Sequence, residues 1–168
     1  MPYLTKQFKF CAAHKYWNDK WDYDKNYQVF GDDVRVHGHN YVLDVTVTGD
    51  VDPDSGFVCD LQHIKSVVNK YVVDILDHNQ IEKDIEWFKG KQQSTENIVL
   101  FICNQFSSKI KKPTKLNKIK LRETPTIFTE YFGPDLYGNK LKNRKNNKRF
   151  IKRVRRRPKP GWFIKNPK

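Results

Sequence analysis

Apolar and polar residues alternate along two stretches near the N-terminus, and this alternation predicts two strands. The first stretch ends at a histidine that shares a face with its apolar side chains, namely Phe8, Phe10, Ala12 and His14. Successive side chains of a strand point to opposite faces of the sheet, so these four should point to one side. The second stretch, 41–48, is rich in β-branched and aromatic residues and lacks Gly and Pro, which also favours a strand.

Two later segments have the spacing of apolar residues that is typical of amphipathic helices. Asp60 can cap the first, whose apolar stripe consists of Leu61, Ile64, Val67, Val68, Tyr71, Val72 and Ile75. The second opens at residues 94–97 and carries apolar positions as far as Ile110, with Pro113 just beyond its end. We expect the segment between them, 81–93, to be irregular.

Two further strands are expected at 115–123 and 126–132, separated by Thr124-Pro125. The resulting order, β-β-α-α-β-β, predicts an α+β fold: an antiparallel sheet with two helices on one face. A long polar and aromatic connection, 15–36, leads into the second strand. Connections of this length are often functional, but this one could equally be a surface excursion held together by its own aromatic residues.

The formal charge of +13 over 168 residues is concentrated at the C-terminus. Residues 134–168 contain fourteen Lys and Arg against one acid, whereas residues 1–133 contain eighteen residues of each sign. We therefore predict one domain at 1–133 followed by a basic, flexible tail at 134–168. The tail could bind RNA or DNA through counterion release, act as a solubilising or partner-binding extension, or attract an anionic substrate.

Cysteine usage and hydropathy bear on the compartment. Three widely separated cysteines, Cys11, Cys59 and Cys103, indicate neither a disulfide framework nor a thiolate zinc finger. No apolar run is long enough to span a bilayer, and the N-terminal residues lack the apolar stretch of a secretory signal. We expect a cytoplasmic protein with free thiols and no membrane partner.

Three histidines indicate a metal site. His37 and His39 are two residues apart at the entry to the second strand, so their imidazoles point to the same side. If the first two strands pair, His14 supplies a third imidazole above an apolar floor. Imidazole suits zinc, and a catalytic zinc usually takes three protein ligands and keeps one position open. Each histidine alone could instead be a packed or solvated residue.

Several short motifs together resemble the family of 6-pyruvoyltetrahydropterin synthase and 6-carboxytetrahydropterin synthase. They occur in the family's order over residues 3–132: Phe8-x-Phe10-x-Ala12-Ala13-His14, His37-Gly38-His39-Asn40-Tyr41, Gly56-Phe57-Val58-x-Asp60-Leu61, Leu76-Asp77-His78, Ser94-Thr95-Glu96-Asn97 and Glu123-Thr124. The resemblance implies the tunnelling fold, in which subunits assemble into an oligomeric barrel, often a hexamer, with pterin sites between subunits.

The resemblance also implies roles for individual residues. The three histidines would hold catalytic Zn²⁺, and Asp77 with His78 would act as a proton relay. Glu123 would anchor the pterin ring through its adjacent N–H donors, with Thr95 nearby. From the residues alone, Asp77-His78 could be a solvated pair at a helix end, Glu123 a surface residue, and Ser94 or Thr95 only a helix cap.

The sequence departs from the family in the connection before the paired histidines, where these enzymes commonly carry a cysteine as general base. Asp33 stands in that position, and no cysteine lies between His14 and Cys59. Asp33 or its neighbour Asp32 could be the base, as in family members with an acidic residue in this region. Alternatively, Cys59 could have taken the role, or the protein could bind zinc and pterin without turnover.

On this resemblance we predict a zinc-dependent carbon–oxygen or carbon–carbon lyase. Its substrate would be 7,8-dihydroneopterin triphosphate and its product 6-carboxy-5,6,7,8-tetrahydropterin, on the route to queuosine and other 7-deazaguanine nucleosides. The short spacing from Asp33 to His37 favours this carboxy-forming branch. The alternatives are a synthase of 6-pyruvoyltetrahydropterin, a lyase that makes a hydroxymethyl pterin for folate, and a basic nucleic-acid-binding module on a catalytically impaired fold.

Overall fold

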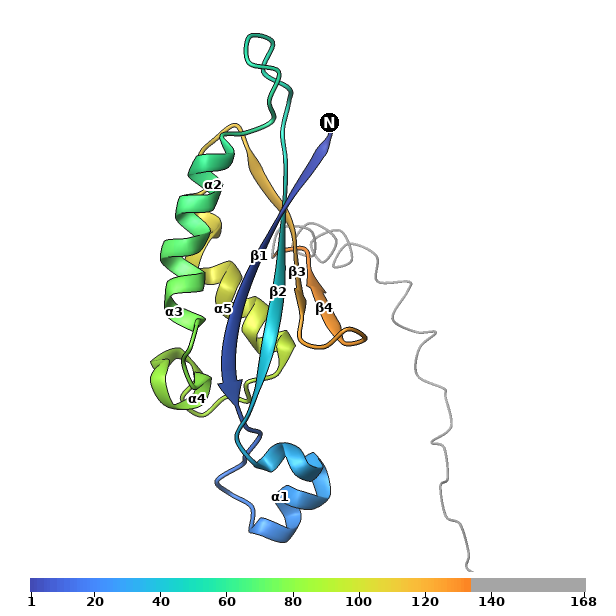
Figure 1. Ribbon diagram of the computed structural model, residues 1–168, viewed down its shortest axis with the longest axis vertical. Coiled ribbons are helices and arrows are strands. Elements are labelled where there is room, and N and C mark those ends of the chain that lie inside the picture. The colour runs from blue at the N-terminus through green and yellow to red at the C-terminus, as the bar shows by residue number, and fades with distance from the viewer. Residues whose placement is uncertain (134–168) are drawn as a thin grey trace, which may run out of the picture. The chain divides into compact units, whose positions relative to one another are not determined.

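The computed structural model describes residues 1–133, which build a four-stranded antiparallel sheet with helices on one face (Figure 1). The strands are β1 (Tyr3–His14), β2 (His37–Thr48), β3 (Lys115–Arg122) and β4 (Phe128–Tyr131), and they lie in that order across the sheet. The predicted α+β fold is therefore confirmed. Each strand pairs with its neighbour in the sequence, so β1 and β4 are the two edges.

The pairing of β1 with β2 extends over the whole length of both strands, from Tyr3 opposite Thr48 to His14 opposite His37. Because side chains alternate between the faces of a sheet, this register places His14, His37 and the apolar residues of both strands on the same face. Phe10 and Tyr41 stack there, with ring centroids 5.1 Å apart.

The helices that cover this face begin at side-chain caps. Asp60 accepts hydrogen bonds from two backbone N–H groups at the start of α2 (Leu61–Val68), and Ser94 accepts one at the start of α5 (Thr95–Phe106). Ser94, rather than Thr95, is thus the helix cap. After α2 the predicted helix widens into a π-helical turn, Asn69–Val73, before α3 (Asp74–Leu76).

The core lies between these helices and the sheet. Its central residues have an exposed fraction of 2% or less: Ala12, Tyr41, Leu43, Val45, Val47, Ile64, Val68, Val72, Leu76, Ile81, Phe88, Ile98, Val99, Phe101, Ile102, Phe106, Ile119 and Leu121. Four residues that the patterns predicted to point inward are in this group: Ala12, Ile64, Val68 and Val72. Phe8, Phe10 and Val67 are buried as well, whereas Leu61, the first residue of the predicted helical stripe, is 44% exposed.

Two segments contain more regular structure than expected. The segment 81–93, predicted to be irregular, contains α4 (Ile81–Asp84) and a 3-10 helix, Glu86–Phe88. Ile81, Ile85 and Phe88 are buried, and their spacing of four and three residues is helical, although charged residues between them obscure it. The connection 15–36 likewise contains α1 (Tyr23–Phe30), capped by Asp22, and a 3-10 helix, Gly31–Val34.

The expectations for the basic tail, including its flexibility and its contact with nucleic acid, concern residues 134–168 and lie outside the described residues. Within residues 1–133, no helix has both the length and the apolar character needed to cross a membrane.

Truncation of Leu43 tests the packing of the sheet against the helices. Leu43 is fully buried on β2, so Leu43→Ala should lower the free energy of unfolding by about 2–5 kcal/mol through lost burial and a residual cavity. Leu100 on α5 is 38% exposed, so Leu100→Ala should change it by less than about 1 kcal/mol. Urea denaturation followed by circular dichroism measures both, and equal losses would contradict this packing.

Candidate metal centre

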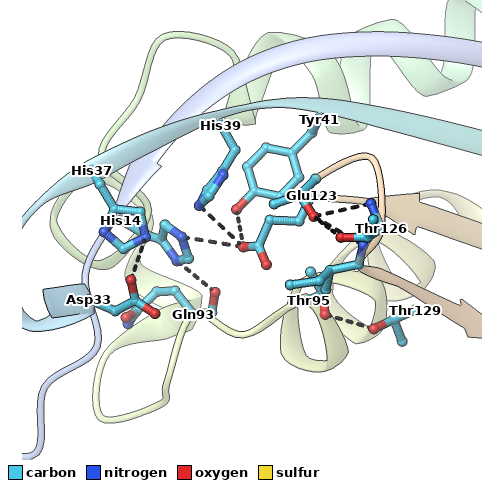
Figure 2. Close-up of polar contacts among 12 residues, drawn as sticks. His14, Asp33, His37, His39, Tyr41, Gln93, Thr95, Glu123, Thr126 and Thr129 are labelled. Atoms are coloured by element: carbon cyan, nitrogen blue, oxygen red, sulfur yellow. Dashed lines mark hydrogen bonds and ion pairs between the residues drawn. The ribbon is translucent and has the colours of Figure 1, made fainter. Parts of the chain in front are cut away.

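The strand pairing gathers three imidazoles at one end of the sheet (Figure 2). His14 is the last residue of β1, and His37 and His39 open β2. One ring nitrogen from each lies within 4.8 Å of the other two. The predicted convergence of the histidines is therefore present, and the three side chains could hold a metal ion.

Backbone carbonyls orient two of these imidazoles. The Nδ1 atom of His14 lies 3.0 Å from the carbonyl oxygen of Gln93, and that of His37 lies 2.9 Å from the carbonyl oxygen of Arg35. A carbonyl only accepts, so Nδ1 carries the proton and Nε2 presents its lone pair to the cluster. His14 Nε2 is buried and has no hydrogen-bond partner among residues 1–133. An orphaned, buried nitrogen lone pair fits a metal ligand.

The electrostatic environment lowers the pKa of two of these imidazoles, those of His14 and His39. Burial, followed by the neighbouring His37 and His39, lowers the pKa of His14 to about 4. Burial also lowers the pKa of His39, although the carboxylate of Glu123 opposes this shift. Neutral imidazole is the form that binds a metal, so the site is prepared for one at neutral pH.

Glu123 lies beside the histidines, directly after β3. Its Oε1 atom is 3.4 Å from His14 Nε2 and 3.6 Å from His39 Nε2, and it accepts a hydrogen bond of 3.1 Å from the Tyr41 hydroxyl. The side chain is only 10% exposed. Tyr41 escaped the sequence prediction as a site residue, although its position two residues after His39 places it on the same face.

Asp33 also reaches the cluster. It lies in the 3-10 helix that precedes β2, and its Oδ1 atom is 3.8 Å from His37 Nε2. The backbone carbonyl of Asp33 accepts a hydrogen bond of 2.8 Å from the N–H of Tyr16, which ties the two ends of the connection together. A carboxylate is therefore present where the resemblance calls for a base. The Asp33 side chain is 56% exposed, so a ligand from solvent can reach it.

Cys59 is remote from the histidines of its own chain. It follows Val58, which lies against Gly49 just past the far end of β2. Twelve residues of strand span roughly 40 Å at about 3.3 Å per residue. Figure 1 shows the 49–60 loop and α1 at opposite ends of the sheet. Cys59 thus cannot act as the base at this chain's own cluster.

Asp77 and His78 form a pair beside the outer edge of β1, where residues 77–80 bond to the backbone of that strand. The Asp77 Oδ2 and His78 Nδ1 atoms are 2.9 Å apart, and Asp77 Oδ1 accepts a hydrogen bond of 2.7 Å from the N–H of Cys11. This N–H, followed by His78, holds the pKa of Asp77 below its usual value. His78 has a left-handed backbone (φ 60°) and a side chain that is 82% exposed. Within residues 1–133, the pair makes no polar contact with the three histidines or Glu123.

Thr95 joins α5 to β4 beside this centre. Its hydroxyl is 2.7 Å from that of Thr129, and the residue is 5% exposed. In the view of Figure 2, Thr95 is drawn between Glu123 and Thr129. Within residues 1–133, the hydrogen bonds of its hydroxyl are to Thr129 and Glu96, and none is to the Glu123 carboxylate.

Comparisons with known proteins agree with this geometry. A 6-pyruvoyl tetrahydrobiopterin synthase of Dictyostelium discoideum is 34% identical over 130 residues, which cover 77% of this chain and 95% of that protein. A 6-carboxy-5,6,7,8-tetrahydropterin synthase of Haemophilus influenzae is 30% identical over 148 residues, covering 76% of this chain and 96% of that protein.

A solved structure of the 6-pyruvoyl tetrahydropterin synthase of Caenorhabditis elegans superposes with a TM-score of 0.71 at 34% identity, covering 79% of this chain and 97% of that one. The family model described as 6-pyruvoyl tetrahydropterin synthase matches residues 3–134. The chain therefore belongs to the 6-pyruvoyl tetrahydropterin synthase family, whose members are pterin synthases of the lyase class.

Proposed function

We propose that the protein is a zinc-dependent lyase that acts on the side chain of 7,8-dihydroneopterin triphosphate. The observation that carries this proposal is the cluster of three imidazoles with Glu123 alongside, on a fold shared with pterin synthases. His14, His37 and His39 would hold the zinc. When bound, Zn²⁺ would supply Lewis-acid polarisation of the hydroxylated side chain.

Glu123 and its neighbours would bind the pterin ring. The aminopyrimidine edge of a pterin offers adjacent N–H donors, which one carboxylate can accept in a bidentate manner. Tyr41 donates to Glu123 Oε1 and so restrains the carboxylate. Burial keeps the pKa of Tyr41 above its usual value, so its hydroxyl remains a donor. Thr95, hydrogen-bonded to Thr129, would lie beside the bound ring.

Asp33 would take the place of the family's cysteine as the base. Its carboxylate lies 3.8 Å from His37 Nε2, so it would face the substrate side chain next to the metal ligands. A carboxylate is a weaker base than a thiolate, and proton abstraction would be correspondingly slower. Binding of zinc and pterin without turnover is the outcome if Asp33 cannot act.

Two observations favour different products. The short segment from Asp33 to His37 supports 6-carboxy-5,6,7,8-tetrahydropterin, a precursor of queuosine, as the product. The higher identity to a 6-pyruvoyl synthase, 34% against 30% for a 6-carboxy synthase, supports 6-pyruvoyltetrahydropterin as the second candidate. In either role we place the enzyme in the cytoplasm.

Asp77 and His78 would complete the site of a neighbouring subunit. The pair lies beside the outer edge of β1, where residues 77–80 bond to the backbone of Cys11 and Ala13, and the His78 side chain faces solvent. Within residues 1–133, the N-terminal part of that edge and the outer edge of β4 pair with no further strand. Pairing of the β1 edge with the β4 edge of another copy would bury both and close a ring, as in the oligomeric barrel predicted for this fold. His78 would then face the neighbouring copy's metal centre and relay protons there.

Zinc binding should depend on His37 but not on Cys59. His37→Ala should weaken zinc binding by more than about 100-fold, because loss of an outer hydrogen-bond partner alone weakens such sites by about 10- to 100-fold. His37 is partly exposed, so its truncation should spare the fold. Competition with a chelating dye and metal analysis by mass spectrometry measure the affinity. Cys59→Ala is the matched control, and parallel losses in both variants would refute the assigned ligands.

Turnover should depend on Asp33. The zinc-loaded protein is incubated with 7,8-dihydroneopterin triphosphate, and the products are identified by mass. Asp33→Ala should lower kcat by about 10²- to 10⁴-fold through loss of the base. Asp33→Cys, which introduces the family's thiol, should retain or raise kcat.

Asp32 provides the control for this experiment, since its carboxylate makes no ion pair with the histidines within residues 1–133. Asp32→Ala should leave kcat within about threefold of the parent value. Acetaldehyde together with the carboxy product would identify the carboxy branch, and the pyruvoyl product the other. Absence of turnover in a zinc-loaded, correctly assembled protein would overturn the lyase proposal for this substrate.

Mixed oligomers test whether the site is shared between subunits. His37→Ala and His78→Ala should each be inactive alone, but co-expression should restore activity to roughly a quarter of the sites for random mixing of the two chains. In such sites one chain supplies the histidine cluster and the other supplies His78. If the assembled mixture stays as inactive as the separate variants, a site shared between chains is refuted.

A further inference from the structure

The connection between β1 and β2, residues 15–36, carries Asp33 and makes most of its hydrogen bonds within itself. Its centre is Asn26, a fully buried polar residue. The Asn26 Nδ2 group donates to the carbonyls of Asn18, Trp21 and Asp22 at 3.1, 3.1 and 2.9 Å, and its Oδ1 accepts from the N–H of Asn18 at 2.8 Å. These bonds satisfy the amide completely and make the connection a compact unit.

Gln92 fastens this unit to the rest of the domain. Its Nε2 group donates to the carbonyl of Trp17 at 2.7 Å, and its Oε1 accepts from the N–H of Trp17 at 3.2 Å. Among residues 1–133, these are the only hydrogen bonds that join the connection to a segment outside it, apart from the contacts of His37, which directly follows. This side-chain amide is therefore the main hydrogen-bonded attachment of the connection within residues 1–133, next to the packing of the Tyr16 ring against that of His14 with centroids 5.1 Å apart.

The segment that contains Gln92 also contacts the start of α5 and the His14 side chain. Asn97, in the first turn of α5, donates to the Gln92 carbonyl at 2.8 Å. The carbonyl of the next residue, Gln93, orients the metal-ligand candidate His14 (Figure 2). On the other side, Trp17 follows Tyr16, whose N–H is bonded to the Asp33 carbonyl. The path from Gln92 to Asp33 thus consists of the hydrogen bonds from the Gln92 side chain to the Trp17 backbone, the peptide unit between Tyr16 and Trp17, and the backbone hydrogen bond from Tyr16 to Asp33.

We propose that Gln92 is a positioning residue that holds Asp33 in a fixed position relative to the three histidines and to the proposed pterin-binding end of α5. This inference rests on the proposed function, because it takes Asp33 as the base. A side-chain amide supplies, from two separate atoms, both the donor and the acceptor that the Trp17 backbone requires. Without it, the connection would keep only its two covalent ends, the contact of Asp33 with His37 and the packing of Tyr16 against His14, and Asp33 would sample a wider range of positions.

The kinetic test uses Gln92→Met, which keeps the length of the side chain but removes both hydrogen bonds. In the zinc-loaded enzyme we expect kcat to fall by about 10- to 100-fold, the effect of misplacing a reacting group by about 1 Å, with zinc content unchanged. Gln62→Met is the matched control, since Gln62 is exposed on α2. Unchanged kcat in Gln92→Met would overturn the proposal.

A double-mutant cycle separates positioning of Asp33 from general damage. If Gln92 acts through Asp33, then Gln92→Met should cause less than about a twofold further loss in the Asp33→Ala background. The same 10- to 100-fold loss in both backgrounds would show that Gln92 acts independently of Asp33, and would overturn the assignment.

A readout without catalysis distinguishes failure of this inference from failure of the proposed function. Trypsin can cut the connection after Lys15, Lys20, Lys25 or Arg35. In native protein, Gln92→Met should accelerate cleavage at these sites by about tenfold relative to Gln62→Met, without faster cleavage in the core, because local opening becomes more frequent. If the parent enzyme shows no turnover but cleavage is accelerated, the proposed function fails while the anchoring role stands. Equal cleavage in both variants would overturn the anchoring role.

Discussion

The site depends above all on the register between β1 and β2. Twelve residues of each strand pair, and this places His14 directly opposite His37. A slip of one residue would turn every side chain of one strand to the other face. His14 would then leave the histidine cluster, and Phe8 and Phe10 would leave the core. Burial of one face of the sheet beneath the helices therefore fixes the orientation of the apolar side chains. The same burial fixes the orientation of the three histidines.

The same burial sets the chemistry of the centre. Covering the strand ends with the segment that leads into α5 removes His14 from water, keeps it neutral and leaves its Nε2 atom without a partner. An unpaired buried nitrogen is unfavourable unless something binds it, so the fold leaves a buried lone pair that a metal ion could bind. The Glu123 carboxylate, restrained by Tyr41, lies beside the three histidines.

The residues proposed to bind metal and substrate or to move protons differ in how firmly the domain holds them. The histidines are on strands, and Glu123 directly follows one, whereas Asp33 belongs to a connection that folds around Asn26 and is attached to the domain through Gln92. Asp77 and His78 are fixed to the β1 backbone but face solvent at the sheet edge. The remaining unpaired edges of the sheet are suited to assembly, and in the proposed assembly this pair would lie near the metal centre of another copy.

Much of this was available from the sequence alone. The α+β fold followed from alternation along two strands and from helical spacing after Asp60 and Ser94. The convergence of the histidines followed from their positions on the same face of neighbouring strands. Both could be predicted because these patterns indicate which face is buried. The sequence did not reveal the helical turns around Ile81 and Phe88, since charged neighbours masked their spacing.

Only the tertiary structure decided which carboxylates and thiols lie near His14, His37 and His39. It brings Asp33 and Tyr41 to the histidines, places Cys59 at the far end of β2, and leaves Asp77 and His78 at an edge. It also shows that Gln92, which no motif marks, fastens the connection that carries Asp33. Such relations join residues tens of positions apart through backbone contacts, and a local pattern of side chains contains no record of them.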